Sequence, residues 1–141
     1  MERSTNELLE ILKSKKTYEK FFYEEVGELC FKSVSEYLEL LLNEKHLQKS
    51  DVIKKANLDK NYAYQIFNGT KTNPSRDKMI MLSFGLNLTL NETRKLLKIS
   101  GLPDLYVRSP RDSVIIFCLH NNENLMKTNE MLNDFGLDVL E

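Results

Sequence analysis

The chain has 141 residues, of which 41% are hydrophobic and 29% charged, a composition that suits a compact domain and excludes a disordered chain. No apolar run approaches the roughly 18 residues of a membrane-spanning helix, and the first residues lack a signal-peptide pattern, so we expect a cytoplasmic protein without a membrane partner. The net charge of −1 gives no overall attraction to nucleic acid, and Cys30 and Cys118 have no metal-site or disulfide spacing.

Two amphipathic helices are predicted before residue 33. Ser4 and Glu7 form a capping box, in which a hydroxyl and a carboxylate satisfy the free amides of a helix start. A second apolar set then keeps spacings of four and three residues, as one face of a helix does. Its members are Tyr18, Phe22, Val26, Leu29 and Cys30. We expect residues 1–32 to form an N-terminal helical extension.

The clearest helical stripe follows a second capping box, Ser33 with Glu36. Its apolar residues repeat at i, i+3, i+4, i+7 and i+8. They are Val34, Tyr37, Leu38, Leu41 and Leu42. A short helix is predicted over residues 49–56, and another over residues 60–68, capped by Asp59. Asn68 and Gly69 close the latter, because glycine adopts the left-handed conformation that ends helices at little cost.

Four more helices are predicted in the rest of the chain. Pro74 and Ser75 open one over residues 76–86, and the capping box of Thr89 and Glu92 opens the next, which ends at Gly101. Residues 113–119 have the composition of a buried strand. The preceding order of Ser109, a proline and an acid is that of a helix start, so we predict a helix. The last helix, residues 125–135, stops at Gly136. The expected fold is therefore all-α.

The charges are unevenly distributed along the chain. Residues 1–44 carry −4 and residues 79–141 carry −2, whereas residues 45–78 carry eight lysines and arginines against three aspartates, or +5. A basic segment between acidic flanks is the pattern expected of a surface that contacts phosphates, although a solvated charged face gives the same pattern. The basic segment therefore needs support from a structural motif.

Two short helices separated by about four residues suggest a helix-turn-helix. Residues 34–101 resemble the lambda-repressor-like, or Xre-type, helix-turn-helix domain of bacterial and phage regulators. Residues 48–53 (QKSDVI) resemble its second helix, residues 60–69 (KNYAYQIFNG) its third, and residues 73–75 (NPS) the entry to its fourth. The resemblance covers about half of the chain. It divides the chain into an N-terminal extension (1–32), a DNA-binding domain (33–101) and a C-terminal helical extension (102–141).

This chain departs from the family pattern at three places. Ile53 stands where the family usually has a small residue and Ala63 where it has a β-branched one, which amounts to a volume-conserving exchange if the two face each other. Asn57 occupies a turn position often held by glycine, and asparagine tolerates the left-handed conformation best among the other residues. Gln48 replaces the usual Ser or Thr cap of the second helix, a mild weakness.

The helix over residues 60–68 is the predicted recognition helix. With Ala63, Ile66 and Phe67 in the core, its opposite face carries polar side chains that could read bases in the major groove, where the resemblance also implies that the first residues of this helix enter. The candidates for base readout are Lys60, Asn61, Tyr64 and Gln65. The candidates for contacts to the DNA backbone are Lys49, Tyr62, Asn68, Thr70, Lys71, Thr72 and Asn73. Tyr62 has an equally weighted alternative, which is packing on a neighbouring helix.

The sequence thus predicts a sequence-specific DNA-binding transcriptional regulator with double-stranded DNA as its partner. Regulators of this kind usually bind as dimers, so we expect a homodimer. The alternative is a protein-interaction module that keeps the fold without binding DNA. Residues 1–32 and 102–141 could extend the core, form the dimer or bind a partner. His46 and His120 are isolated and no phosphate-binding glycine loop occurs, so we expect no enzyme and no cofactor.

Overall fold

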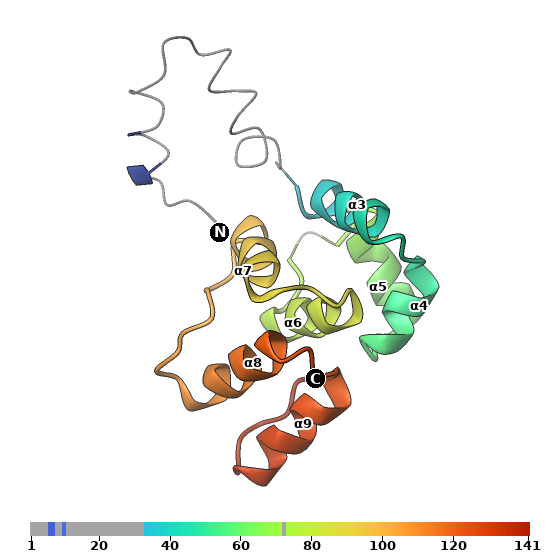
Figure 1. Cartoon of the computed structure of the whole chain (residues 1–141). Helices are drawn as coiled ribbons and strands as arrows, with labels where there is room; N and C mark the ends of the chain where they lie inside the picture. Colours follow the sequence, from blue (N-terminus) through green and yellow to red (C-terminus); the bar gives the residue numbers. More distant parts are fainter. Residues whose placement is uncertain (1–5, 8–9, 11–32, 72) are drawn as a thin grey trace. The chain divides into compact units, whose positions relative to one another are not determined.

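The structure of the protein is a computed structural model, which describes residues 6–7, 10, 33–71 and 73–141 (Figure 1). The chain divides into two units, residues 1–32 and residues 33–141. Apart from residues 6–7 and 10, the helices predicted in residues 1–32 fall outside the described part.

The described part of residues 33–141 is all-helical, as predicted, and contains no strand. Its seven helices are α3 (Val34–Lys45), α4 (Lys49–Lys55), α5 (Lys60–Phe67), α6 (Arg76–Gly85), α7 (Leu90–Ile99), α8 (Pro110–His120) and α9 (Leu125–Asp134). None of them is long and apolar enough to cross a membrane. Several end one residue before the predicted boundary, because that last residue is the C-cap rather than a member of the helix, as at Asn68 and Leu86.

Except for α4, the described helices begin after residues whose side chains cap them. The hydroxyl of Ser75 accepts a hydrogen bond from the Lys78 amide, and Thr89 and Glu92 form the complete capping box at the start of α7. Ser109 caps α8 with a proline in its first turn, so the apolar run 113–119 is helical and not a strand. The turn after α4 has Asn57 at φ 53°, and Gly69 after α5 has φ 83°, the left-handed conformations predicted for both.

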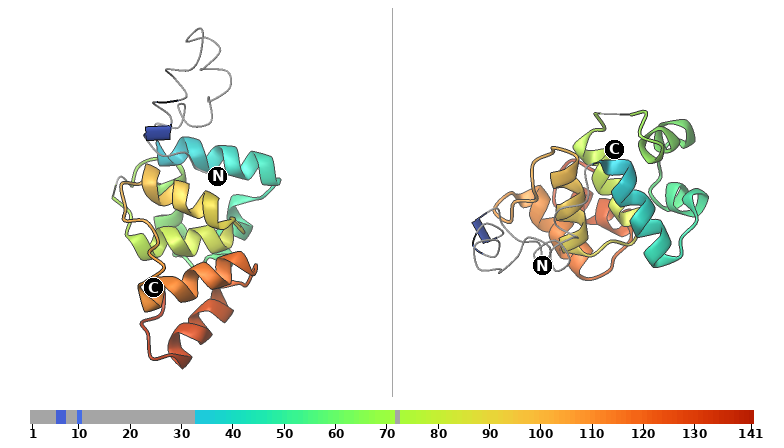
Figure 2. Two further views of the ribbon diagram at one scale, coloured as in Figure 1. Left: turned by 60° about the vertical axis from the view of Figure 1, so that its left-hand side comes forward. Right: turned by 90° about the horizontal axis from the view of Figure 1, so that it is seen from above.

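Helix α6 occupies the centre of the unit. It packs against α4, α7 and α9, while α3 packs against α5 and α7, and α8 against α7 and α9. Figure 2 shows the resulting succession from α3 and α7 through α6 to α8 and α9. Ile80 and Leu82 of α6 are fully buried, as are Ile115 of α8 and Leu132 of α9. Residues 102–141 therefore extend the core formed by residues 33–101, one of the roles considered for them.

At Gly85, helix α6 lies close against the main chain of α4. A Cβ atom at this position would lie 2.5 Å from the main-chain oxygen of Val52 and 2.8 Å from the Cβ of Ala56. Only a residue without a side chain lets the two helices come so near. Gly85 thus sets the position of α4 on the core, a role that its place inside an apolar helix did not indicate.

Candidate nucleic-acid interface

Helices α4 and α5 are two short helices joined by the four residues 56–59. The carboxylate of Asp59 accepts a hydrogen bond from the Tyr62 amide and so begins α5, whereas Gln48 makes no side-chain cap at the start of α4, as predicted. Val52 and Ile53 of α4 are buried, and so is the apolar face of α5, namely Ala63, Ile66 and Phe67. Because α5 packs on α3 with this face, its opposite face is directed to solvent.

The four candidates for base readout lie on that outer face of α5. Lys60, Asn61 and Gln65 are exposed, and Tyr64 is half-buried. Within the described residues, none of the four side chains makes a hydrogen bond or an ion pair with the protein. Their ammonium, amide and phenol groups are therefore available to an external partner, and Asn61 and Gln65 are separated by one helical turn.

The described residues after α5, 68–71 and 73–75, begin by turning back along the end of the helix. The side-chain oxygen of Asn68 accepts a hydrogen bond from the Thr70 amide at 2.9 Å, and the Lys71 amide donates to the main-chain oxygen of Gln65 at 3.0 Å. Thr70, Lys71 and Asn73 are exposed next to α5, while Thr72 lies outside the described residues. Except for Thr72, the predicted backbone contacts in this loop therefore adjoin the predicted reading helix.

Tyr62 joins α5 to this loop. Its hydroxyl oxygen accepts a hydrogen bond from the Ser75 amide at 3.4 Å, and the Lys71 ammonium lies 5.5 Å from the centre of its ring. Tyr62 is half-buried, and it packs on the loop that leads into α6. The predicted alternative for Tyr62 is packing on a neighbouring helix, whereas these two contacts are with the loop, beside Lys71.

Several basic side chains of the segment 45–78 are already engaged within the protein. The Lys49 ammonium lies 2.8 Å from a carboxylate oxygen of Glu39 and 5.6 Å from the ring centre of Phe67. Lys45 pairs with Glu92 at 3.0 Å, and Arg76 pairs with Asp112. In the described part of the chain, the basic residues of this segment without an ion pair are Lys54, Lys55, Lys60, Lys71 and Lys78. The positive field around this segment is therefore weaker than its formal net charge of +5 suggests.

Arg76 and Asp77 at the start of α6 pair reciprocally with Arg111 and Asp112 at the start of α8. Arg76 donates to both carboxylate oxygens of Asp112 at 3.0 and 2.8 Å, and Arg111 donates to both of Asp77 at 2.9 and 2.8 Å. We call these four residues the Arg–Asp clamp. Sequence analysis missed it, although the dipeptide Arg-Asp occurs at both predicted helix starts, a repetition that could have indicated the pairing.

The clamp makes the stability of the unit depend on pH. Burial alone would raise the pKa of Asp77, but the hydrogen bonds and charge of Arg111, together with the Glu141 amide and the charge of Arg76, hold that pKa below its ordinary value. A carboxyl group with a depressed pKa in the folded state stabilises the fold above its unfolded pKa of about 3.9 and loses that contribution as the pH falls through the folded value.

Asp77→Asn is therefore expected to lower the free energy of unfolding at pH 7 and to matter progressively less as the pH falls from 7 through the lowered pKa of the wild-type carboxyl, which then becomes protonated as well. The measurement is urea unfolding of both proteins across this pH range. An equal difference between the two proteins at both ends of the range would contradict the electrostatic role of Asp77.

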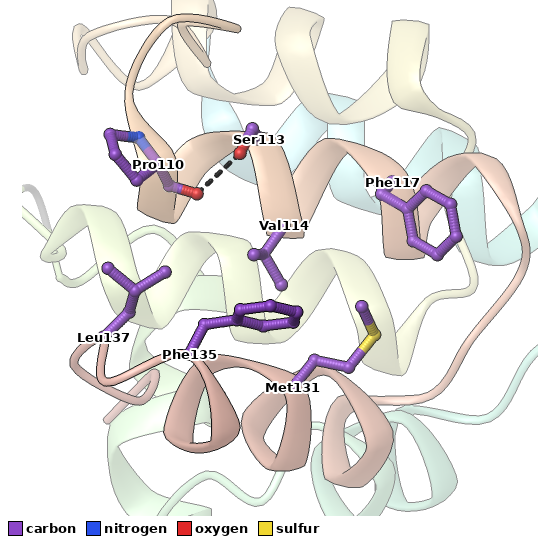
Figure 3. A pocket seen from close by; sticks show the side chains of 7 residues that line it. All are labelled: Pro110, Ser113, Val114, Phe117, Met131, Phe135 and Leu137. Atoms are coloured by element: carbon purple, nitrogen blue, oxygen red, sulfur yellow. Dashed lines mark hydrogen bonds between the residues drawn. The ribbon is translucent and has the colours of Figure 1, made fainter.

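A second, apolar surface lies on the C-terminal helices. A groove of about 460 Å³ is lined by residues of α8, α9 and the segment after α9, and Figure 3 shows Val114 pointing into it towards Phe135 and Met131. Phe117 and Phe135 are 53% and 69% exposed, and in the described residues the exposed large apolar side chains all belong to residues 102–141. A patch of this kind is typical of a surface that meets another molecule.

The comparisons with known proteins return no relative. No protein-family model matches the chain, and no curated protein or solved structure matches it either. A function for this chain is therefore inferred from the arrangement of its own residues.

Proposed function

We propose that the protein is a sequence-specific DNA-binding transcriptional regulator of the lambda-repressor-like type, which reads the major groove with α5. The observation that carries the proposal is the outer face of α5. Its side chains Lys60, Asn61 and Gln65 are exposed and make no hydrogen bond or ion pair with the described residues. Planar amides can bridge two atoms of adenine, and a lysine at a helix start can reach guanine or a phosphate.

The geometry next to α5 supports this proposal. The left-handed Asn57 provides the sharp turn that two adjacent short helices need, and Ile53 and Ala63 are both buried, as the exchanged pair requires. The loop after α5 presents Thr70 and Lys71 beside the reading face, where contacts to phosphates would fix the register of the protein on the duplex.

Selection from random DNA duplexes at two salt concentrations tests the proposal. Contacts to phosphates weaken steeply with salt, whereas base contacts supply the sequence preference. We expect a defined sequence motif that persists at the higher salt concentration. A palindromic motif with half-sites about one turn apart would report the homodimer that we propose. Recovery of unselected sequence at both concentrations would refute the proposal.

Asn61→Ala and Gln65→Ala are each expected to cost about 1–3 kcal/mol of binding free energy for the selected duplex and to relax the preference at one base position. The reason is the loss of hydrogen bonds to a base edge, while the contacts to the backbone stay in place. Fluorescence anisotropy with the selected and a random duplex measures both effects. Lys54→Ala is the matched control, because Lys54 is exposed on α4 outside this face. An equal loss on both duplexes would refute a role in readout.

Lys71→Ala is expected to weaken binding to all sequences and to reduce the slope of log K against log salt by about one, because one phosphate contact disappears. Lys49→Ala should reduce this slope less, since the Lys49 ammonium is already paired with Glu39 and releases fewer counterions on binding. The salt dependence of binding to a random duplex measures both slopes. A larger reduction of the slope after Lys49→Ala than after Lys71→Ala would mean that Lys49 leaves Glu39 to contact the DNA.

The second candidate function is a protein-interaction module without DNA binding. The observation that favours it is the internal pairing of Lys45, Lys49 and Arg76, which compensates three of the eight positive charges of the basic segment within the protein. The exposed apolar groove between α8 and α9 would be the contact surface. The absence of DNA binding in the selection, with binding of a protein lost after Phe117→Ser or Phe135→Ser, would favour this function.

A further inference from the structure

A cleft of about 1190 Å³ lies beside the C-terminal end of α6, the helix that packs against both α4 and α9. Its other lining residues belong to α4 and the turns at the two ends of α4, to the turn between α8 and α9, and to α9. Phe84 and Leu125 contribute buried apolar surface, and Met126 adds a flexible apolar side chain that is 73% exposed. The cleft exceeds the roughly 300–1,000 Å³ of most sites for small molecules, so it has room for a longer ligand.

Three helices end at this cleft in the same way. Helices α4, α6 and α8 are followed by Asn57, Asn87 and Asn122, which have left-handed φ angles of 53°, 53° and 57° and all line the cleft. In each case the main-chain amides of the asparagine and of the next residue bond back to carbonyls of the helix, which is the closure of a Schellman motif. The same turn thus directs three asparagines to one place.

A left-handed turn does not by itself require asparagine. Glycine adopts this conformation without strain, and the chain uses it after α5, α7 and α9, at Gly69, Gly101 and Gly136, none of which lines the cleft. The three asparagines at the cleft are exposed, and within the described residues their side chains make no hydrogen bond. Their amide groups are therefore available to a ligand.

The polar groups of the cleft match those of a polypeptide. A side-chain amide offers the same donor and acceptor as a main-chain peptide group, so it can pair with an extended peptide of any sequence. The charged side chains add a direction: Lys54 and Lys55 lie on α4, whereas Glu123 lies in the turn before α9. None of these three has an ion pair within the described part of the chain. A peptide that is acidic towards α4 and basic towards α9 would complement them.

We propose that this cleft is a binding site for an extended peptide segment of a partner. The peptide main chain pairs with the side-chain amides of Asn57, Asn87 and Asn122, and its acidic side chains lie towards Lys54 and Lys55. The cleft contains no residue of α5, so this inference does not depend on the proposed DNA binding. It also shares no lining residue with the apolar groove of α8 and α9.

The test begins with selection from a library of random short peptides on the immobilised full chain. An enriched peptide is then titrated calorimetrically into the wild type, into Asn57→Gly, Asn87→Gly and Asn122→Gly, and into the triple variant. Glycine suits the left-handed conformation, so these variants lose the amide and keep the turn. The matched control is His46→Gly, the same change at the left-handed end of α3, because His46 does not line the cleft. Thermal unfolding checks that every variant folds.

Each single variant is expected to bind the peptide about fivefold more weakly, and the triple variant on the order of a hundredfold, because hydrogen bonds to the peptide are lost. Their unfolding temperatures should be unchanged or raised, and His46→Gly should bind as the wild type does. In the wild type, the NMR signals of the three side-chain amides should shift on titration.

Failure to enrich any peptide over a matrix without protein would overturn the inference, and so would wild-type affinity in the triple variant. Loss of binding after Phe117→Ser, with full binding in the glycine variants, would place the peptide in the apolar groove of α8 and α9 and would overturn the inference as well.

Discussion

Asp112→Ala is expected to lower the free energy of unfolding by about 3–5 kcal/mol, the usual cost of removing one partner from a buried ion pair. The Asp112 carboxylate accepts two hydrogen bonds from Arg76 and one from the Tyr106 amide. Alanine would leave the guanidinium of Arg76, whose side chain is 22% exposed, without its counter-charge, and the amide without its acceptor. A donor left unsatisfied in the interior costs more than a hydrogen bond contributes when it is made.

Urea unfolding measures this loss as a shift of the midpoint at an unchanged slope. Asp104→Ala is the matched control, because the Asp104 side chain pairs with Arg94 in the same bidentate manner but is 51% exposed. Exposed pairs contribute only about 0.2–1 kcal/mol, so the control should lose much less stability. Similar losses in the two variants would mean that the start of α6 opens to water and that the clamp is not an interior pair.

The helix starts were predictable because their signals are local. Ser109 and Pro110 identified the start of α8 despite the strand-like composition of the residues that follow, and Asp59 and Gly69 marked both ends of α5. A cap acts within one helical turn, so a few consecutive residues contain all the information. The outer face of α5 was predictable for the same reason, since the helical period alone places Asn61 and Gln65 opposite Ala63 and Ile66.

The features that the sequence did not indicate all depend on partners distant in the chain. Lys49 was considered only as a phosphate contact, but it meets Glu39 on α3 and the ring of Phe67 on α5. Arg76 was counted in the basic segment, but its charge is compensated by a residue 36 positions away. A linear count of charge cannot include such pairs, because the fold decides which helix ends meet. The sequence therefore predicts the polar outer face of α5 better than it predicts the electrostatic field around it.

Gly85→Ala is expected to destabilise the fold by about 3 kcal/mol, although alanine is the better helix former by about 1 kcal/mol. The added methyl group would lie 2.5 Å from the main-chain oxygen of Val52, and backbone cannot yield as a flexible side chain does. Relief requires α4 to move away from α6, which opens the contact that buries Val52 and Ala56. Urea unfolding of the variant measures the loss, and an unchanged or increased stability would contradict the close approach of the two helices.

A double-mutant cycle with Ala56→Gly identifies the cause of that loss. The new methyl group would also lie 2.8 Å from the Cβ of Ala56, so removing this Cβ relieves one of the two clashes and leaves the other. The two substitutions together should therefore cost less than the sum of their separate effects, by about 0.5–3 kcal/mol, as for residues in direct contact. If the effects of the two substitutions simply add, the strain in Gly85→Ala does not arise from the contact with Ala56. Because α4 leads into the turn at Asn57, the displacement of α4 in Gly85→Ala would also move the proposed reading helix relative to its neighbour, so this variant should bind DNA more weakly as well.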